Sequence, residues 1–576
     1  MTELMKYASL TDLRLLAPMI LVAVVACALL MLQVFQRAAA SRTYLAWVAV
    51  AGLAAAGIDT LYLLGRGTQS FAMGQMLFVD GFALMVNLIC IFGAILACLI
   101  SPAYLADHRM ARGEYYALIL FSVVGMMVMA AGADLFAIFI GLEMMSIPVY
   151  CLAGFFRHSN RSAEAAMKYF FLGAIASAIF LYGIALLYGV TGTTNLVLMA
   201  RALDAGGVSQ LSPNDVAGAS ALAARTGLLE FVGVQAGSGL PLFKLGMLPG
   251  MGLVMVLVAF AFKVALVPFH MWTPDAYQGS PSSAVAFMST AVKAAAFAGL
   301  IRVFFVAFWG QPARLSGTGW VGVLFFLALV SMVYGNLAAI VQKNVKRILA
   351  YSSVAHGGYI TVGVVAAAAG PTQVVNLDGV LFYLVVYTAA TAGAFGVLAY
   401  FGKRGEECQT LEDLSGIAER YPGAALAMTI FLLSSAGIPP TGGFLAKFYV
   451  FKAAIQTGDQ AFIGLAIAGV LASVAGVYYY LKIIMAMYMK TGRRRVQEVS
   501  GLPLRLALTI CAAVTLLLGV YPSPVLNTAR DSVVGALGWS AEVRQGLNAA
   551  KSPRILSLED AARPADAAST AALVKP

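Results

Sequence analysis

The sequence is poor in charged residues and in cysteine, and it lacks the motifs of soluble redox and nucleotide-binding proteins. Only 11% of its 576 residues are charged, and 6 are cysteines. No two cysteines form a CxxC pair, and no run of cysteines resembles one that holds an iron–sulfur cluster. A GxxxxGK[ST] phosphate-binding loop is also missing. We therefore expect no metal, iron–sulfur centre, disulfide framework, ATP or NADH in this chain.

Apolar residues dominate instead. They make up 61% of the chain, and the mean hydropathy is +0.87, far above that of a soluble globular domain. Roughly fourteen apolar runs are long enough to cross a membrane as helices, and the alternation of a β-barrel is absent. The sequence therefore predicts an all-α polytopic membrane protein. The runs lie near 13–35, 43–64, 77–101, 115–131, 133–155, 164–190, 248–270, 281–306, 318–341, 348–367, 375–401, 423–455, 461–490 and 503–527.

Lysine and arginine gather in alternate loops between these runs. Such loops usually face the cytoplasm, so an even number of crossings places both termini on the opposite side. This bias accounts for most of the net charge of +11 without any nucleic-acid partner. The basic loops contain Arg37, Arg42, Arg109, Arg112, Arg157, Arg161, Lys343, Lys346, Arg347, Lys403, Arg404, Arg420, Lys490, Arg493, Arg494 and Arg495. We interpret Lys343, Lys346 and Arg347 as anchors at the membrane surface.

Three segments carry no expected mechanism. The N-terminal stretch MTELMKYASLTDLR contains acidic residues and resembles no cleaved signal peptide. Residues 195 to about 247 are predicted to form a long outer loop, rich in Ala and Gly, and an insertion explains it better than a site does. The tail from residue 528 to 576 has the mixed composition of a flexible segment.

Among the charged side chains inside the apolar runs, five stand out. Placing such a charge in a membrane helix costs at least about 2.5–3.5 kcal/mol, so a persistent one usually faces a wet interior or a partner. The five are Glu143, Lys168, Lys263, Lys293 and Lys447. Glu143 is about ten residues from either end of its run, and Lys168, on the next run, is within reach of an ion pair with it. A purely structural pair, or a lysine that reaches the surface, is the alternative interpretation for these two residues.

Proline predicts a break beside one of the lysines. In AFKVALVPFHMW, Pro268 follows Lys263 by five residues, so the helix should be interrupted between Lys263 and His270. Interrupted helices at membrane depth are tolerated where they line water or ions. Lys263 is therefore a candidate site for a transported ion.

A second break is predicted just before Lys447. Gly437, Pro439 and Pro440 precede this lysine in FLLSSAGIPPTGGFLAKFYVF. Two interrupted helices, each with a lysine, indicate a transport path through the bundle.

Lys293 and two histidines complete the candidates. Lys293 lies roughly twelve residues into its run, and no acidic residue shares that run, so proton release and recapture near neutral pH is feasible. His356 and His270 are candidate proton relays, but a histidine that only hydrogen-bonds between helices is an equally open interpretation.

Five stretches resemble a known family. They read GLEMMSIPVYCLAGF, SAEAAMKYFFLGAIASAIFLYGIALLYGVTG, FKVALVPFHMWTPDAYQGSP, RILAYSSVAHGGY and FLLSSAGIPPTGGFLAKFYVF. Together they resemble the antiporter-like proton-pumping subunits of respiratory complex I, the NADH:quinone oxidoreductase, over about residues 80–490. A lysine at 447 resembles the subunit-N branch, because subunit M has an acidic residue there. The tail has no room for the long lateral helix of subunit L.

The resemblance implies a fold and a set of roles. The fold would hold three helices in 1–114, inverted five-helix repeats in 115–306 and 318–490, a last helix in 503–527 and a tail, with the seventh and twelfth of fourteen helices discontinuous. Glu143 and Lys168 would be the coupling pair. Lys263, Lys293 and Lys447 would carry protons across the membrane midplane.

The resemblance also implies partners. NADH, FMN, iron–sulfur clusters and quinone would bind in other subunits, and the neighbours would be the antiporter-like subunit M and small membrane subunits such as K and J, in a bacterial inner membrane. Three alternatives stay open: a subunit of an Mrp-type cation/proton antiporter, a membrane scaffold with structural charges, and a related complex with another electron donor.

Overall fold

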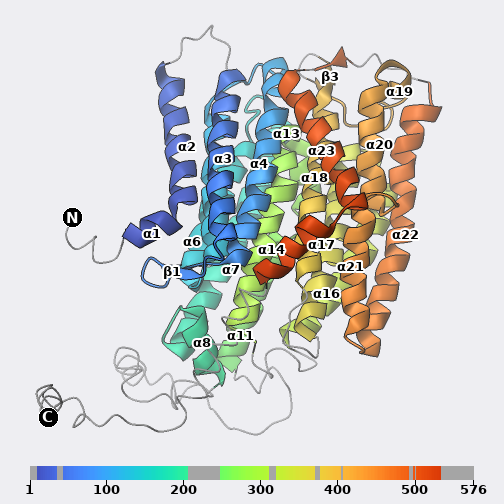
Figure 1. Cartoon of the computed structure of the whole chain (residues 1–576). Coiled ribbons are helices and arrows are strands. Elements are labelled where there is room, and N and C mark those ends of the chain that lie inside the picture. The colour runs from blue at the N-terminus through green and yellow to red at the C-terminus, as the bar shows by residue number, and fades with distance from the viewer. Residues whose placement is uncertain are drawn as a thin grey trace, which may run out of the picture. The chain divides into compact units, whose positions relative to one another are not determined.

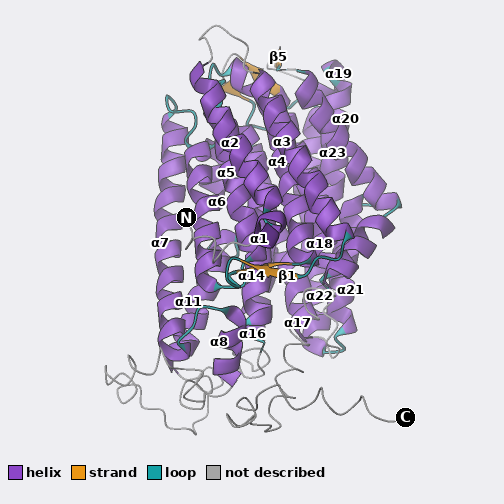
Figure 2. Ribbon diagram, turned by 60° about the vertical axis from the view of Figure 1, so that its left-hand side comes forward, coloured by secondary structure: helices purple, strands orange, loops and turns teal. Residues whose placement is uncertain are grey.

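A computed structural model gives a bundle of long helices that run side by side, with short strands in the connections between them (Figures 1 and 2). It describes residues 10–35, 43–204, 247–309, 319–369, 377–403, 406–491, 497–499 and 501–533. The expected all-α polytopic membrane protein is confirmed, because 12 described helices are long and apolar enough to cross a membrane. Two shorter apolar helices, α11 and α20, adjoin the two predicted breaks.

The first half of the described chain contains α1 Leu10–Leu15, α2 Ala17–Phe35, α3 Thr43–Gly65, β1 Ser70–Ala72, β2 Leu77–Val79, α4 Gly81–Asp107, α5 Glu114–Ala131, α6 Leu135–Ala153, α7 Asn160–Thr191, α8 Leu196–Asp204, α11 Met247–Lys263, α12 Thr273–Gly279, α13 Ser282–Phe287, a π-helical turn Met288–Val292 and α14 Lys293–Val306. The second half contains α16 Trp320–Val341, α17 Val345–Ala369, α18 Asp378–Tyr400, β3 Phe401–Lys403, β4 Glu406–Glu407, α19 Ile417–Arg420, α20 Pro422–Ala436, α21 Gly442–Gln456, α22 Gln460–Met489, β5 Gln497–Glu498 and α23 Leu502–Val520.

Two segments that were expected to be irregular are partly helical. The expected loop at 195–247 begins with α8, and its residues 205–246 lie outside the described residues. The expected tail begins inside a helical segment at 523–533. This segment packs on the start of α4, where a Cβ added to Gly81 would lie 2.8 Å from the Ser532 backbone. Of the basic loops, 36–42, 404–405 and 492–496 are likewise not described.

Helices α4, α14, α17 and α18 form the interior of the bundle and are buried over nearly their whole length. Helices α2, α3, α7, α16, α22 and α23 surround them and expose one apolar face each, as helices next to lipid do. In Figure 1, α14, α17 and α18 occupy the middle of the molecule. Polar side chains on these inner helices are therefore shielded from lipid by protein.

Small residues let the helices approach closely. At the α5–α6 contact, a Cβ on Gly141 would lie 2.7 Å from the amide nitrogen of Met129. At the α16–α17 contact, a Cβ on Gly335 would lie 2.7 Å from the amide nitrogen of Ala355. Close backbone packing stabilises membrane helices where apolar surface gains nothing by leaving lipid.

The first predicted break is confirmed. Helix α11 ends at Lys263, and α12 begins only at Thr273, with Pro268 in the gap. The interrupted backbone is partly satisfied by a side chain, because the Val267 amide donates to Ser331 Oγ at 2.9 Å. Lys263 therefore ends a half-helix inside the protein.

The second predicted break is confirmed as well. Helix α20 ends at Ala436, and α21 begins at Gly442, so Pro439 and Pro440 lie between them. Gly437 closes α20 with a φ of +85°, a left-handed conformation that favours glycine.

A third irregularity was not predicted from the sequence. The run near 281–306 was expected to be one continuous helix, but a π-helical turn at Met288–Val292 separates α13 from α14. The residue that follows this turn is Lys293.

Candidate functional site

Lys263 lies at the end of α11 and is 4% exposed. Its Nζ donates to Ser146 Oγ at 2.8 Å and to Tyr150 Oη at 3.1 Å, both on α6. The ring of Tyr150 also faces the ammonium, with the centroid 5.5 Å away. Two hydroxyl groups that both donate and accept hydrogen bonds thus surround the first lysine of the site.

Glu143 and Lys168 do not form the ion pair that their places on consecutive helices predict. The Glu143 carboxylate accepts a hydrogen bond from Ser177 Oγ of α7. Lys168 lies roughly 13 Å from Ser177 along α7, at 1.5 Å per residue, because it belongs to the first turns of that helix. Glu143 instead shares a face of α6 with Ser146, the partner of Lys263.

Lys168 belongs to a surface network at the end of α7. Its Nζ contacts Glu164 at 2.7 Å and Asp275 at 2.8 Å, and its side chain is 45% exposed. Asp275, on α12, also pairs with Arg347 of α17 at 2.7 Å. Pairs this exposed contribute little stability individually, but this network joins α7, α12 and α17.

Lys293 is 2% exposed and points at α17. Its Nζ donates to both the carbonyl and the hydroxyl oxygen of Ser353, each at 2.6 Å. Tyr387 of α18 donates to the same hydroxyl at 2.9 Å. A Cβ added to Gly357 would lie 3.8 Å from Lys293 Nζ and 3.1 Å from the Val264 carbonyl oxygen, so Lys293 is close to the break after α11.

His356 lies between Lys293 and Lys447, within electrostatic reach of both. Its ring nitrogens are 2.7 Å from Tyr383 Oη and 3.1 Å from Tyr480 Oη. These contacts are compatible with both open interpretations, so the role of His356 as a relay stays a prediction. The sequence signal for this arrangement was the spacing of YSSVAHGGY, which puts Ser353, His356 and Tyr359 on one face of α17.

Lys447 lies on α21, at the second break, and is 7% exposed. Its Nζ donates to the carbonyl oxygens of Ser435 at 2.9 Å and Ala436 at 3.0 Å, and to Ser473 Oγ at 2.6 Å. The two carbonyls end α20, whose dipole favours a cation there. The Tyr359 ring lies 5.0 Å from the ammonium, so α17 contacts the third lysine as well.

His270 is placed in the first break, apart from this chain of contacts. It is 9% exposed, and its ring packs edge-on against Tyr334 at 5.0 Å between centroids. Its Nδ1 is buried without a hydrogen-bond partner among the described residues. Its role as a relay remains a prediction.

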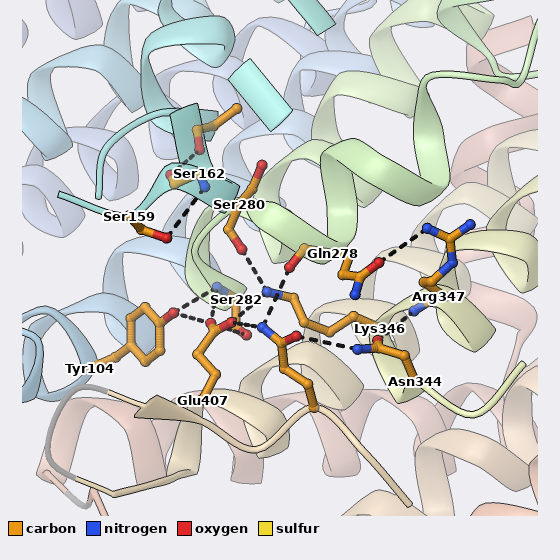
Figure 3. Close-up of polar contacts among 12 residues, drawn as sticks. Tyr104, Ser159, Ser162, Gln278, Ser280, Ser282, Asn344, Lys346, Arg347 and Glu407 are labelled. Atoms are coloured by element: carbon orange, nitrogen blue, oxygen red, sulfur yellow. Dashed lines mark hydrogen bonds and ion pairs between the residues drawn. The ribbon is translucent and has the colours of Figure 1, made fainter. Parts of the chain in front are cut away.

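Lys346 is a buried ion-pair partner, and its interpretation as a surface anchor was wrong. It is fully buried and pairs with Glu407 at 2.8 Å, while donating to the Ser280 carbonyl at 2.6 Å. Tyr104 Oη and Ser282 Oγ also donate to the Glu407 carboxylate. Figure 3 shows the lysine and the two hydroxyls converging on this carboxylate. The cluster ties α4, the start of α13, α17 and the β4 loop together.

Glu407 is a fixed negative charge. Burial by itself raises the pKa of its carboxyl, but the charge of Lys346 and hydrogen bonds from Lys346, Tyr104 and Ser282 outweigh burial and hold that pKa at about 2. A carboxylate this strongly held as an anion does not exchange protons near neutral pH. The cluster is therefore electrostatic and structural, and not a relay.

The low pKa of Glu407 predicts a pH dependence of stability. Because the folded pKa lies below the ordinary value of about 4.3, the carboxylate stabilises the fold above about pH 4.5 and loses this contribution as pH falls toward 2. We expect Glu407→Gln to lower the thermal stability of the solubilised protein by an amount that is constant down to about pH 5.5 and narrows below about pH 4.5. Glu164→Gln, at an exposed carboxylate, should show no such difference. A Glu407→Gln difference that instead grows toward acid would contradict the assignment.

Together, three buried lysines, a histidine and several hydroxyls extend from α6 through the interior to α21. Each group can accept or donate a proton, and the tyrosine and serine hydroxyls can pass one between them. Among the described residues, no three His, Cys, Asp or Glu side chains gather as ligands of a metal ion. The geometry thus suits the movement of protons through side chains and water.

Comparisons with known proteins agree on one family. Residues 132–474 match the model of the family described as NADH:quinone oxidoreductase/Mrp antiporter, transmembrane. The NADH-quinone oxidoreductase subunit N of Trichlorobacter lovleyi is 42% identical over 523 residues, which cover 91% of this chain and 97% of that relative.

Solved structures give the same picture. A chain of respiratory complex I from Thermus thermophilus, solved with bound aureothin, is 31% identical with a TM-score of 0.69, and the match covers 89% of this chain and 100% of that chain. A chain of the Mrp complex from a Dietzia species shares the fold with a TM-score of 0.70, at 23% identity over 92% of this chain and 99% of that one.

Proposed function

The chain belongs to the NADH:quinone oxidoreductase/Mrp antiporter family of membrane proteins, and we propose that it is a subunit of the subunit-N type in the membrane arm of a proton-pumping NADH:quinone oxidoreductase. The observation that carries the proposal is the buried axis. Lys263, Lys293 and Lys447 are each less than a tenth exposed, and each has hydroxyl partners. Buried lysines that only stabilised the fold would be expected to pair with carboxylates.

The proton path follows the hydrogen bonds. A proton on Lys263 passes to Lys293 across the break after α11, where the Val264 carbonyl oxygen and Lys293 Nζ both lie within 4 Å of the Cβ position of Gly357. It then moves along Ser353 and His356 toward Lys447. Water completes the path where side chains do not touch, as between lysines on different helices.

The driving force is electrostatic. Glu143 is the acidic group on the α6 face that holds Lys263, so a change in charge beside Glu143 alters how well Lys263 keeps its proton. The surface network of Lys168 and Asp275 joins α7 to α12, on the far side of the same break, and is the link by which movement at α7 reaches the path. Redox chemistry takes place in other subunits, which hold NADH, FMN, iron–sulfur clusters and quinone, and the coupling is a difference in interaction energy between two states.

The full topology is part of the proposal. If α11 with α12 and α20 with α21 each make one discontinuous crossing, the 12 long helices and these two give fourteen crossings. Both ends of the chain then lie on the periplasmic side of a bacterial inner membrane. The packing of α7 on α11 and α12, and of α22 on α20 and α21, supports two related five-helix units. Neighbouring subunits of the M, K and J types would adjoin this subunit in the lipid bilayer.

Lys447 and Lys452 offer a matched test on one helix, because the first is buried at the break and the second is exposed. In inverted membrane vesicles with the assembled complex, we expect Lys447→Met to lower NADH-driven proton uptake about tenfold or more, since a proton carrier is lost. Lys452→Met should pump normally. Normal pumping by both variants would rule out the axis. Exchange of Na⁺ or K⁺ for H⁺ without NADH would instead indicate the Mrp-type antiporter.

A further inference from the structure

Helix α13, the π-helical turn and α14 form one continuous helical segment that contains Lys293 and is held at both ends by buried ion pairs. At its start, the backbone amide and hydroxyl of Ser282 donate to the Glu407 carboxylate, which pairs with Lys346. Near its other end, Arg302 pairs with Asp80 at 2.7 Å, and the two side chains are 4% and 0% exposed. Between these anchors lies the π-helical turn at Met288–Val292. Because both ends are fixed, the extra residue of the wide turn stays within the helix.

The position of this turn decides where Lys293 points. Each residue of an α-helix is rotated by about 100° from the one before it, so moving the extra residue past Lys293 would turn its side chain away from α17. Two hydroxyls support the turn where it is. Ser289 Oγ donates to the Val285 carbonyl at 2.7 Å, and Thr290 Oγ1 donates to the Ala286 carbonyl at 2.6 Å.

Helix α4 packs against the same turn. The Cys90 thiol contacts the carbonyl oxygen of Ala291 at 3.7 Å, within hydrogen-bond range for sulfur. One turn along α4, a Cβ added to Gly93 would lie 3.1 Å from Ala291 Cβ and 3.3 Å from Thr290 Oγ1. An alanine at 93 therefore requires the turn and α4 to separate by a few tenths of an ångström, and a larger side chain requires more.

We propose that Cys90 and Gly93 are positioning residues for proton transfer: they hold the π-helical turn in the register that directs Lys293 Nζ to Ser353. The inference rests on the proposed function of Lys293 as a proton carrier. Neither residue is a proton carrier in this proposal. Their effect passes through the backbone of residues 288–292, which is continuous with Lys293.

The test uses a graded series in the assembled complex in inverted vesicles. We expect Gly93→Ala to lower the rate of NADH-driven proton pumping about threefold and Gly93→Val about tenfold, with the pH profile of pumping displaced in both. Cys90→Ser keeps a hydrogen-bond donor and should keep the wild-type profile, whereas Cys90→Ala should displace it. The control is Gly57→Ala, on α3 against α4, where the added Cβ would meet only Ile91 Cγ2 at 3.6 Å.

The outcomes separate this inference from the proposed function. If Lys293→Ala stops pumping while the Gly93 and Cys90 variants keep the wild-type pumping rate and pH profile, the contacts of α4 with the turn have no positioning role and the inference is wrong. If Lys293→Ala itself pumps normally, the proposed function fails. If the Gly93 variants do not assemble, Cys90→Ser and Cys90→Ala still test the inference, because neither substitution adds volume. Identical pH profiles of pumping in these two variants would overturn it.

Discussion

Replacing Lys263 with alanine in an assembled complex is expected to slow proton pumping and electron transfer together, each by about tenfold or more. Lys263 contacts Ser146, which lies three residues after Glu143 on α6, and it ends the half-helix before the first break. On the proposed path, Lys293 then loses the group that would supply its proton. A tightly coupled machine then cannot complete its cycle. The measurement is NADH oxidation and proton uptake in the same inverted vesicles, normalised to the amount of complex.

Two further variants separate charge from proton transfer at this position. Lys263→Arg keeps a cation near Ser146 and Tyr150, but a guanidinium does not release its proton, so pumping should stay blocked. Tyr150→Phe removes one hydrogen bond and leaves the lysine in place, so its effect should be smaller. Normal rates of both activities in Lys263→Ala would show that the path does not run through this lysine. The break after α11 would then be structural.

The spans and the breaks were predictable from the sequence because their signals are local. A run of about 20 apolar residues can satisfy its backbone in lipid only as a helix. Proline can interrupt such a helix, especially where glycine or a second proline lies nearby, and the gaps before Thr273 and before Gly442 lie where Pro268 and Gly437 indicated. A single proline does not always do so, because α4 and α6 continue through Pro102 and Pro148. The π-helical turn before Lys293 has no comparable signal, since it depends on contacts with α4 and on anchors at distant points.

The partners of the charges were less predictable. Glu143 and Lys168 lie on consecutive helices, and closeness in sequence suggested a pair. Whether two side chains pair depends on their positions along the axes of the two helices. These positions place Glu143 beside Ser177 and Lys168 beside Asp275. Chain connectivity gives the neighbour of a helix but not the height at which its side chains meet.

Lys346 shows a second limit. A lysine at the start of a membrane helix usually reaches the surface, and hydropathy does not reveal which face of α17 is covered. Its partner Glu407 is 61 residues further along the chain, in a connection between helices. Only the folded arrangement of α4, α13 and α17 brings the two together (Figure 3).

The pair between Lys346 and Glu407 should respond differently to single and double substitution. Removing one partner leaves the other charge buried, which costs about 3–5 kcal/mol. Lys346→Met or Glu407→Gln alone should therefore severely lower the amount of assembled complex and its thermal stability. The double variant Lys346→Met/Glu407→Gln buries no net charge and should recover most of the loss. Native gels and thermal unfolding of the solubilised complex measure both effects.

The neighbouring Arg347 provides the control for this comparison. It pairs with Asp275 at 2.7 Å, but its side chain is 27% exposed, so Arg347→Met should cost only about 0–1 kcal/mol. If the double variant is as unstable as the single ones, the hydrogen bonds to Ser280 and Tyr104, and not the balance of charge, hold the cluster together. If the double variant recovers stability but pumps poorly, the cluster also fixes where the helix of Lys293 begins, because Ser282 is bound to the same carboxylate.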